Sequence, residues 1–112
     1  MSALAEKLRR ARQTTVMVGP HSYTVTRPTD ADAATLGTLT VLEIVRRFTV
    51  NWNGVTELSL GIPGGSDVPV QFDAELFAEW IADQPACWGP LADAIVGAYR
   101  AHAQAREDAE KN

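Results

Sequence analysis

Residues able to act as nucleophiles or metal ligands are few and scattered in this sequence. The chain has one cysteine, Cys87, and two histidines, His21 and His102. A thiol beside an imidazole is the nucleophile pair that these residues allow, with either histidine as partner. Cys87 is followed by Trp88, and a lone cysteine among apolar residues usually behaves as a small core side chain. A structural zinc site needs about four clustered Cys or His ligands. We therefore predict no catalytic residue, no metal site and no cofactor.

Two further patterns contain suitable residue types but in the wrong context. Glu75 and Glu79 are four residues apart, which places both carboxylates on one helix face, where such pairs are usually solvated. Residues 61–66, GIPGGS, carry the glycines of a phosphate loop but lack its lysine and its G-x-x-x-x-G-K-[ST] order. We interpret the first as a surface pair and the second as a flexible turn, so the sequence indicates a protein that is not an enzyme.

Charge is unevenly distributed along the chain. The net charge is −4, with a balance of +3 over residues 1–47 and −7 over residues 48–112. This asymmetry fits contact between the halves, head-to-tail association, a polar partner face, or two solvated faces. The basic cluster of Arg9, Arg10 and Arg12 has no interleaved aromatic residues, which argues against nucleic acid. These arginines are candidate contacts for an acidic helix of a protein partner.

Length and composition indicate one globular domain, residues 1–112. The hydrophobic fraction of 46% and charged fraction of 21% are ordinary for such domains. A single cysteine excludes a disulfide within the chain and fits a reducing compartment. No apolar run approaches the roughly 18 residues of a membrane span. We expect a soluble, cytoplasmic protein that does not bind membranes.

The first third of the chain predicts a helix, a hairpin and the start of a second helix. Residues 2–13 contain good helix formers, with a thin stripe of Leu4 and Leu8, so this helix is expected either to be peripheral or to be made firm only by a partner. Residues 14–19 and 22–26 are rich in β-branched residues and flank a Gly-Pro break, which is typical of a hairpin. Thr29 with Asp32 forms a capping-box-like pair for a helix within residues 27–37.

The middle of the chain allows two readings. Residues 38–52 place Leu39, Leu42, Val45, Phe48 and Trp52 on one stripe at helical spacing, which predicts a helix, although a strand over residues 48–52 stays open. The Asn53-Gly54 pair is a hairpin turn signal, but a glycine just past a helical stripe is also a C-terminal cap at positive φ. The helical stripe from Leu39 to Trp52 favours the interpretation of Gly54 as a helix C-terminal cap. Residues 55–72 then form a mostly extended connection with room for one short strand.

Two more helices are predicted in the last third. The first covers residues 73–84, capped by Asp73 and ended by Pro85. The second runs from about Cys87 to Glu107, and the polar tail of residues 102–112 is expected to fray. The resulting fold class is α+β and mainly α-helical: a small N-terminal β-hairpin packed on a bundle of four to five helices.

The aromatic residues of the second half either form one core or line a groove for a partner helix. The candidate anchors are Trp52, Phe77, Trp80 and Trp88, since tryptophan is enriched in the centres of protein interfaces. The sequence leaves both possibilities open.

The order of motifs resembles a known family. An apolar helix ends in VNWNGVTE, a loop follows with VPVQFD, and an amphipathic helix carries LFAEWIADQPACWGPL. With the opening SYTVTRPTDADAATL, this arrangement over about residues 22–100 is similar to the tail assembly chaperones of long-tailed bacteriophages and their prophage relatives. The N-terminal arginine-rich helix and the segment from Leu58 to Gly65 depart from that pattern.

The resemblance implies a non-enzymatic role in virion assembly. Such chaperones bind the long helical tape measure protein and keep it soluble in the bacterial cytoplasm while the tail tube assembles. The expected partner is therefore a helical protein, and a homo-oligomer is compatible with this role. The alternatives are another small phage tail protein, for tail completion or as an adaptor, and a small enzyme or regulator of unknown ligand.

Overall fold

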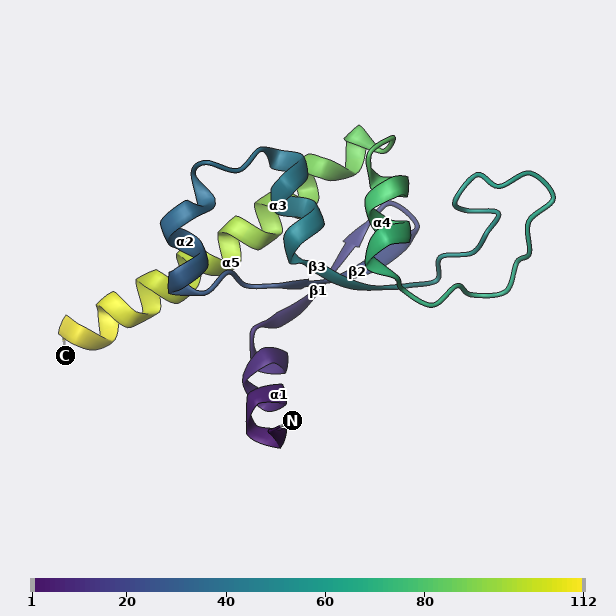
Figure 1. The fold of residues 1–112 in the computed structure, drawn as a ribbon. Coiled ribbons are helices and arrows are strands. Elements are labelled where there is room, and N and C mark those ends of the chain that lie inside the picture. Colours follow the sequence, from purple (N-terminus) through teal and green to yellow (C-terminus); the bar gives the residue numbers. More distant parts are fainter. Residues whose placement is uncertain (1, 112) are drawn as a thin grey trace.

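The computed structural model describes residues 2–111. They form an α+β fold in which helices pack on one small sheet (Figure 1). The elements in chain order are α1 (Ala3–Ala11), β1 (Gln13–Val18), β2 (His21–Thr26), α2 (Asp30–Leu36), α3 (Val41–Phe48), β3 (Thr49–Asn53), α4 (Ala74–Ile81) and α5 (Pro85–Lys111). The predicted class is confirmed: the chain is mainly helical, with an N-terminal hairpin packed against helices.

A third strand, β3, extends the predicted hairpin into a three-stranded sheet. The sheet order is β1-β2-β3, with both pairs antiparallel. Val16 lies opposite Tyr23, and Tyr23 lies opposite Trp52, so one row of side chains crosses all three strands. Because side chains alternate along a strand, this row shares one face, which packs on the helices. A third strand with an apolar face gives the hairpin the support that two strands alone lack.

The predicted helix over residues 38–52 is wrong in its second half. Helix α3 ends at Phe48, and Thr49 to Asn53 pair with β2. Trp52 is four residues after Phe48, so it fits a helical stripe, but it is also buried as a strand residue beside Tyr23. Gly54 has a φ of +82°, as expected for a cap, yet it follows a strand rather than a helix. Long-range pairing with β2 decided between the two readings.

Local capping signals placed the starts of the helices. Thr29 with Asp32 and Thr40 with Glu43 form reciprocal capping boxes at α2 and α3, in which side chain and backbone satisfy each other. The Oδ1 of Asp73 accepts a hydrogen bond from the Leu76 amide at 3.0 Å and begins α4. Each cap satisfies an amide that the helix itself leaves unpaired.

Two helix ends differ from the sequence prediction. Helix α4 ends at Ile81, and Pro85 begins α5, where a missing N–H is harmless. Helix α5 continues to Lys111, so residues 102–111 belong to the helix, which the sequence predicted to end near Glu107; Asn112 lies outside the described residues. The Tyr99 hydroxyl donates to Asp30 at 2.9 Å, and Arg106 pairs with the same carboxylate, which holds this part of α5 beside α2.

The core lies between the inner sheet face and α3, α4 and α5, and it contains Tyr23, Val25, Ile44, Val45, Phe48, Trp52, Val55, Phe77, Ile81, Leu91, Ala92 and Ile95. Helix α1 contributes no buried residue and projects away from the rest of the chain (Figure 1). Helix α1 therefore lies at the periphery of the described chain.

Candidate functional site

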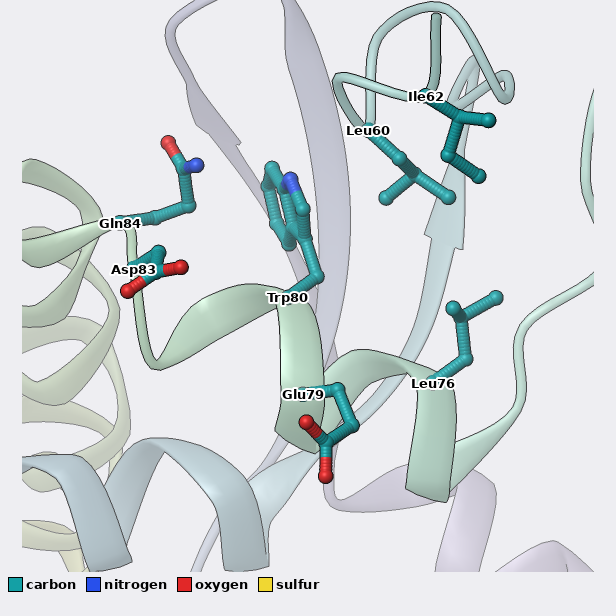
Figure 2. Close-up of a pocket in the computed structure, with 7 residues that line it drawn as sticks. All are labelled: Leu60, Ile62, Leu76, Glu79, Trp80, Asp83 and Gln84. Atoms are coloured by element: carbon teal, nitrogen blue, oxygen red, sulfur yellow. The ribbon is translucent and has the colours of Figure 1, made fainter. Parts of the chain in front are cut away.

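A groove beside the aromatic residues lies between α4 and the connection of residues 55–72 (Figure 2). It has a volume of about 290 Å³ and is lined by Leu60, Ile62, Leu76, Glu79, Trp80, Asp83 and Gln84. We call it the Trp80 groove. Its floor is apolar, and two carboxylates, Glu79 and Asp83, stand at its edge.

Helix α4 divides its side chains between core and groove. Phe77 and Ile81, which are 1% and 0% exposed, point into the core. Leu76 and Trp80 are also four residues apart, so they share the neighbouring face. Figure 2 shows the Trp80 ring rising from α4, with Leu60 and Leu76 to one side and Gln84 to the other. The amphipathic spacing of α4 thus produces a half-buried aromatic wall.

The opposite wall is a loop held in place by specific hydrogen bonds. The Trp52 indole donates to the Val70 carbonyl oxygen at 2.8 Å, and the Val70 amide donates to Val55 at 2.7 Å. Within the loop, Glu57 accepts a hydrogen bond from the Ser66 amide at 2.8 Å. These hydrogen bonds hold the two ends of the loop of residues 55–72 together. Leu60 therefore lies over α4 rather than in open solvent.

The aromatic side chains form one contact cluster. Trp80 stacks on Tyr23 with ring centroids 6.3 Å apart and meets Trp52 edge-on at 6.2 Å. Phe77 and Phe72 complete the cluster, 5.6 Å apart. Edge-to-face and offset arrangements at these distances are favourable. The cluster makes the groove wall rigid, which reduces the entropy that docking would otherwise lose.

A second hollow of about 330 Å³ lies on the other side of Trp80. It is lined by Val18, Gly19, Pro20, His21, Tyr23, Ser59, Trp80, Gln84, Ala86 and Cys87. His21 Nδ1, the Tyr23 hydroxyl and Trp80 Nε1 are buried around it without a hydrogen-bond partner among residues 2–111. Burial raises the pKa of Tyr23, so the phenol stays neutral.

This second hollow brings together the one thiol–imidazole pair worth testing, His21 and Cys87. Burial raises the pKa of the Cys87 thiol, whereas an activated nucleophile needs a lowered one. His102 lies elsewhere, on α5, with its ring 6.2 Å from that of Tyr99. No group of three or more His, Cys, Asp or Glu residues in the described chain is arranged to hold a metal ion.

The four aromatic anchor candidates occupy different environments. Trp52 and Phe77 are core residues, 6% and 1% exposed. Trp80 is half-buried and lines both hollows. Trp88 is half-buried, and its indole donates to the Ile81 carbonyl oxygen at 2.6 Å, where it ties α5 to the end of α4. Of the four, Trp80 is the one that lines the Trp80 groove.

The three arginine candidates also lie in different environments. Arg9 and Arg12 line a hollow of about 310 Å³ together with Arg27 and Arg47, which the sequence reading had not selected. Arg10 does not line it, and its guanidinium lies 3.8 Å from Glu6 within α1. We call the hollow containing the four arginines the basic hollow.

Sequence reasoning missed the aliphatic walls of the Trp80 groove. Leu76 had a usable signal, because it is four residues before Trp80 on one helix. Leu60 and Ile62 had none, because a loop carries no periodicity that shows which side chains face a helix.

Comparisons with known proteins identify no relative: no family model, no curated protein and no solved structure matches this chain. Within residues 2–111, every helix is too short or too polar to cross a membrane.

Proposed function

We propose that this chain is a tail assembly chaperone of a long-tailed bacteriophage or prophage. It binds an amphipathic helix of the tape measure protein in the Trp80 groove and keeps that protein soluble in the bacterial cytoplasm. The observation that supports the proposal is the groove itself, which has a preformed aromatic and aliphatic floor and a carboxylate edge. The family in this proposal comes from the resemblance in motif order around Trp52 and Trp80, although VNWN lies on β3 and not at the end of a helix.

The groove favours a particular kind of helix. An amphipathic helix presents apolar side chains at i, i+3, i+4 and i+7 to a groove. Leu60, Leu76 and Trp80 offer the matching apolar surface. Glu79 and Asp83 favour a helix with lysine or arginine beside that apolar stripe, because opposite charges at an interface edge speed association and select partners. We therefore propose a basic amphipathic segment as the bound element.

Co-expression with the tape measure product tests the proposal. The candidate to co-express is a very long helical protein encoded by a neighbouring gene, and we expect it to become soluble and to copurify. Leu60→Asp should reduce the recovered complex at least tenfold, since it buries a charge against the partner's apolar face. Leu58→Asp is the matched control, because Leu58 lies in the same loop, is 53% exposed and does not line the groove.

The result that counts against the proposal is an insoluble tape measure product with wild-type protein present, or equal loss with both variants. Mass spectrometry of purified particles then separates the roles, since an assembly chaperone is absent from mature virions and a tail completion or adaptor protein remains. A rise in melting temperature with a small molecule would instead indicate a ligand-binding enzyme or regulator.

A further inference from the structure

Helix α1 has an apolar stripe that nothing in the described chain covers. Leu4 and Leu8 are 71% and 63% exposed, and no residue of α1 is buried. The helix has nine residues, and isolated helices shorter than about 12 residues are marginal in water. An apolar stripe on an unsupported short helix indicates a contact made with another chain.

The C-terminal end of α1 leads into the basic hollow. Arg9 and Arg12 come from this end, Arg27 follows β2, and Arg47 belongs to α3. A backbone hydrogen bond of 2.8 Å from the Arg27 amide to the Arg12 carbonyl oxygen holds these segments together. Four guanidinium groups around one hollow repel one another unless anions approach them.

The chain itself supplies little of that negative charge. Asp32 is the one carboxylate in the lining, and its Oδ2 already accepts hydrogen bonds from the Thr29 amide at 2.9 Å and the Thr29 hydroxyl at 3.0 Å. Among residues 2–111, none of the four arginines has an ion pair within 4.0 Å. The basic hollow thus has a net positive charge in a protein whose total charge is −4.

The matching acidic surface lies at the end of α5. Glu107, Asp108 and Glu110 are exposed there, just beyond Arg106, which pairs with Asp30 of α2. Glu107 lies 3.6 Å from Lys111 and Asp108 accepts a hydrogen bond from Gln104 at 2.9 Å, so docking would exchange these local contacts for the arginines. The small residues Ala101 and Ala105 repeat at the four-residue spacing of Leu4 and Leu8. Helix residues four apart share one face, so this end of α5 combines a shallow apolar strip with carboxylates.

We infer that the end of α5 from a second copy of this chain docks along α1 and places its carboxylates in the basic hollow. The lengths agree, since α1 is about 13.5 Å long and α5 from Arg100 to Lys111 about 18 Å, at 1.5 Å per residue. The arginines lie at the C-terminal end of α1 and the carboxylates at the C-terminal end of α5, so the two helices run parallel.

A second copy of this chain would contact both the arginines of the basic hollow and the stripe of Leu4 and Leu8, whereas a phosphate-bearing ligand would contact the arginines alone. A nucleic acid would meet the arginines but leave Leu4 and Leu8 exposed, and it would be repelled by the remaining acidic surface. The inference is independent of the proposed chaperone function, because the Trp80 groove lies on α4 and shares no lining residue with the basic hollow.

Mass measurements at two salt concentrations test the inference with the full chain. Sedimentation velocity at about 0.05 M salt should give a mass above the 12.1 kDa monomer, and about 0.5 M salt should shift it toward the monomer, because screening shortens the range of these charges. Leu4→Ser/Leu8→Ser should also weaken association at both salt concentrations, since it removes the apolar contact.

Charge reversal provides the sharper test. Arg12→Glu/Arg47→Glu and Glu107→Lys/Glu110→Lys should each weaken self-association at least tenfold. An equimolar mixture of the two variants should restore it, because one contact in a mixed pair is native and the other has both charges reversed. Asp67→Lys/Glu75→Lys is the matched control with the same charge change at two exposed residues outside both the basic hollow and the Trp80 groove, and it should associate like the wild type.

Restoration on mixing also demonstrates that both variants are folded. The inference is overturned if the wild-type chain is monomeric at about 0.05 M salt, or if the mixture stays monomeric while circular dichroism shows both variants to be folded. Salt-sensitive binding of a single-stranded oligonucleotide that requires Arg12 and Arg47, without self-association, would assign the basic hollow to phosphate groups and would also overturn it.

Discussion

The indole Nε1 of Trp52 donates a hydrogen bond to the carbonyl oxygen of Val70 at 2.8 Å, across 18 residues of sequence. This bond joins the end of β3 to the far end of the loop that forms one wall of the Trp80 groove. By contrast, the Nε1 of Trp80 is buried without an acceptor in the described part of the chain. The two tryptophans therefore contribute to stability in different ways.

Replacing each of these tryptophans by phenylalanine should show the difference. Trp52→Phe leaves the Val70 carbonyl oxygen without its donor, which should lower the free energy of unfolding by about 1–3 kcal/mol. Trp80→Phe removes a donor that has no partner, so it should lower the free energy of unfolding less. Urea denaturation followed by circular dichroism measures both values, and equal losses would contradict the assigned role of the Trp52 bond.

Gly54 and Gly97 should respond to alanine in opposite directions. Gly54 has a φ of +82°, where a β-carbon is strained, so Gly54→Ala should lower the free energy of unfolding by about 1 kcal/mol. Gly97 lies inside α5 with open space around its Cα, so Gly97→Ala should raise that free energy by up to about 1 kcal/mol through helix propensity. Thermal and urea unfolding of the two variants give the signs, and a stabilised Gly54→Ala would show that this backbone conformation relaxes freely.

The Asp30 carboxylate should influence stability in acid. Its hydrogen bond from Tyr99, followed by that from Arg106, holds its pKa below the usual value. A carboxylate with a lowered folded-state pKa stabilises the fold above its unfolded value near 4, and this stabilisation is lost as the pH falls through the folded pKa.

Asp30→Asn should therefore destabilise the protein at neutral pH and show a smaller further loss of stability below about pH 4 than the wild type. Melting temperatures measured between pH 7 and acid give the two curves. Asp93→Asn, on the exposed side of α5, controls for the loss of one negative charge. Parallel acid curves for wild type and Asp30→Asn would contradict a role for this carboxylate.

The Cys87 thiol should be slow to react. Burial raises its pKa, so less thiolate is present near neutral pH than for an ordinary cysteine. We expect its reaction with a disulfide reagent at about pH 7.5 to be at least tenfold slower in the folded chain than in urea. A folded-state rate above the unfolded rate would indicate an activated cysteine and would reopen an enzymatic role for the hollow that it shares with His21.

Several features followed from the sequence because their causes are local. The capping box at Thr29 was predicted because Thr29 and Asp32 are three residues apart; Thr40 and Glu43 have the same local spacing, although the sequence prediction did not select them. The core-facing pair Phe77 and Ile81 follows from helical spacing in the same way. Exposure of Leu4 and Leu8 also followed, since a two-leucine stripe is too narrow to bury a helix.

Only the tertiary structure decided the features that depend on distant residues. Thr49 to Asn53 form a strand because β2, far earlier in the chain, satisfies their backbone hydrogen bonds, and this outweighs a helical pattern of side chains. Leu60 reaches α4 because Trp52 holds the loop at Val70, and Arg27 and Arg47 join Arg9 and Arg12 because strand pairing and helix packing bring their segments together. Spacing along the chain reports neighbours within an element, whereas the groove and the basic hollow arise between elements.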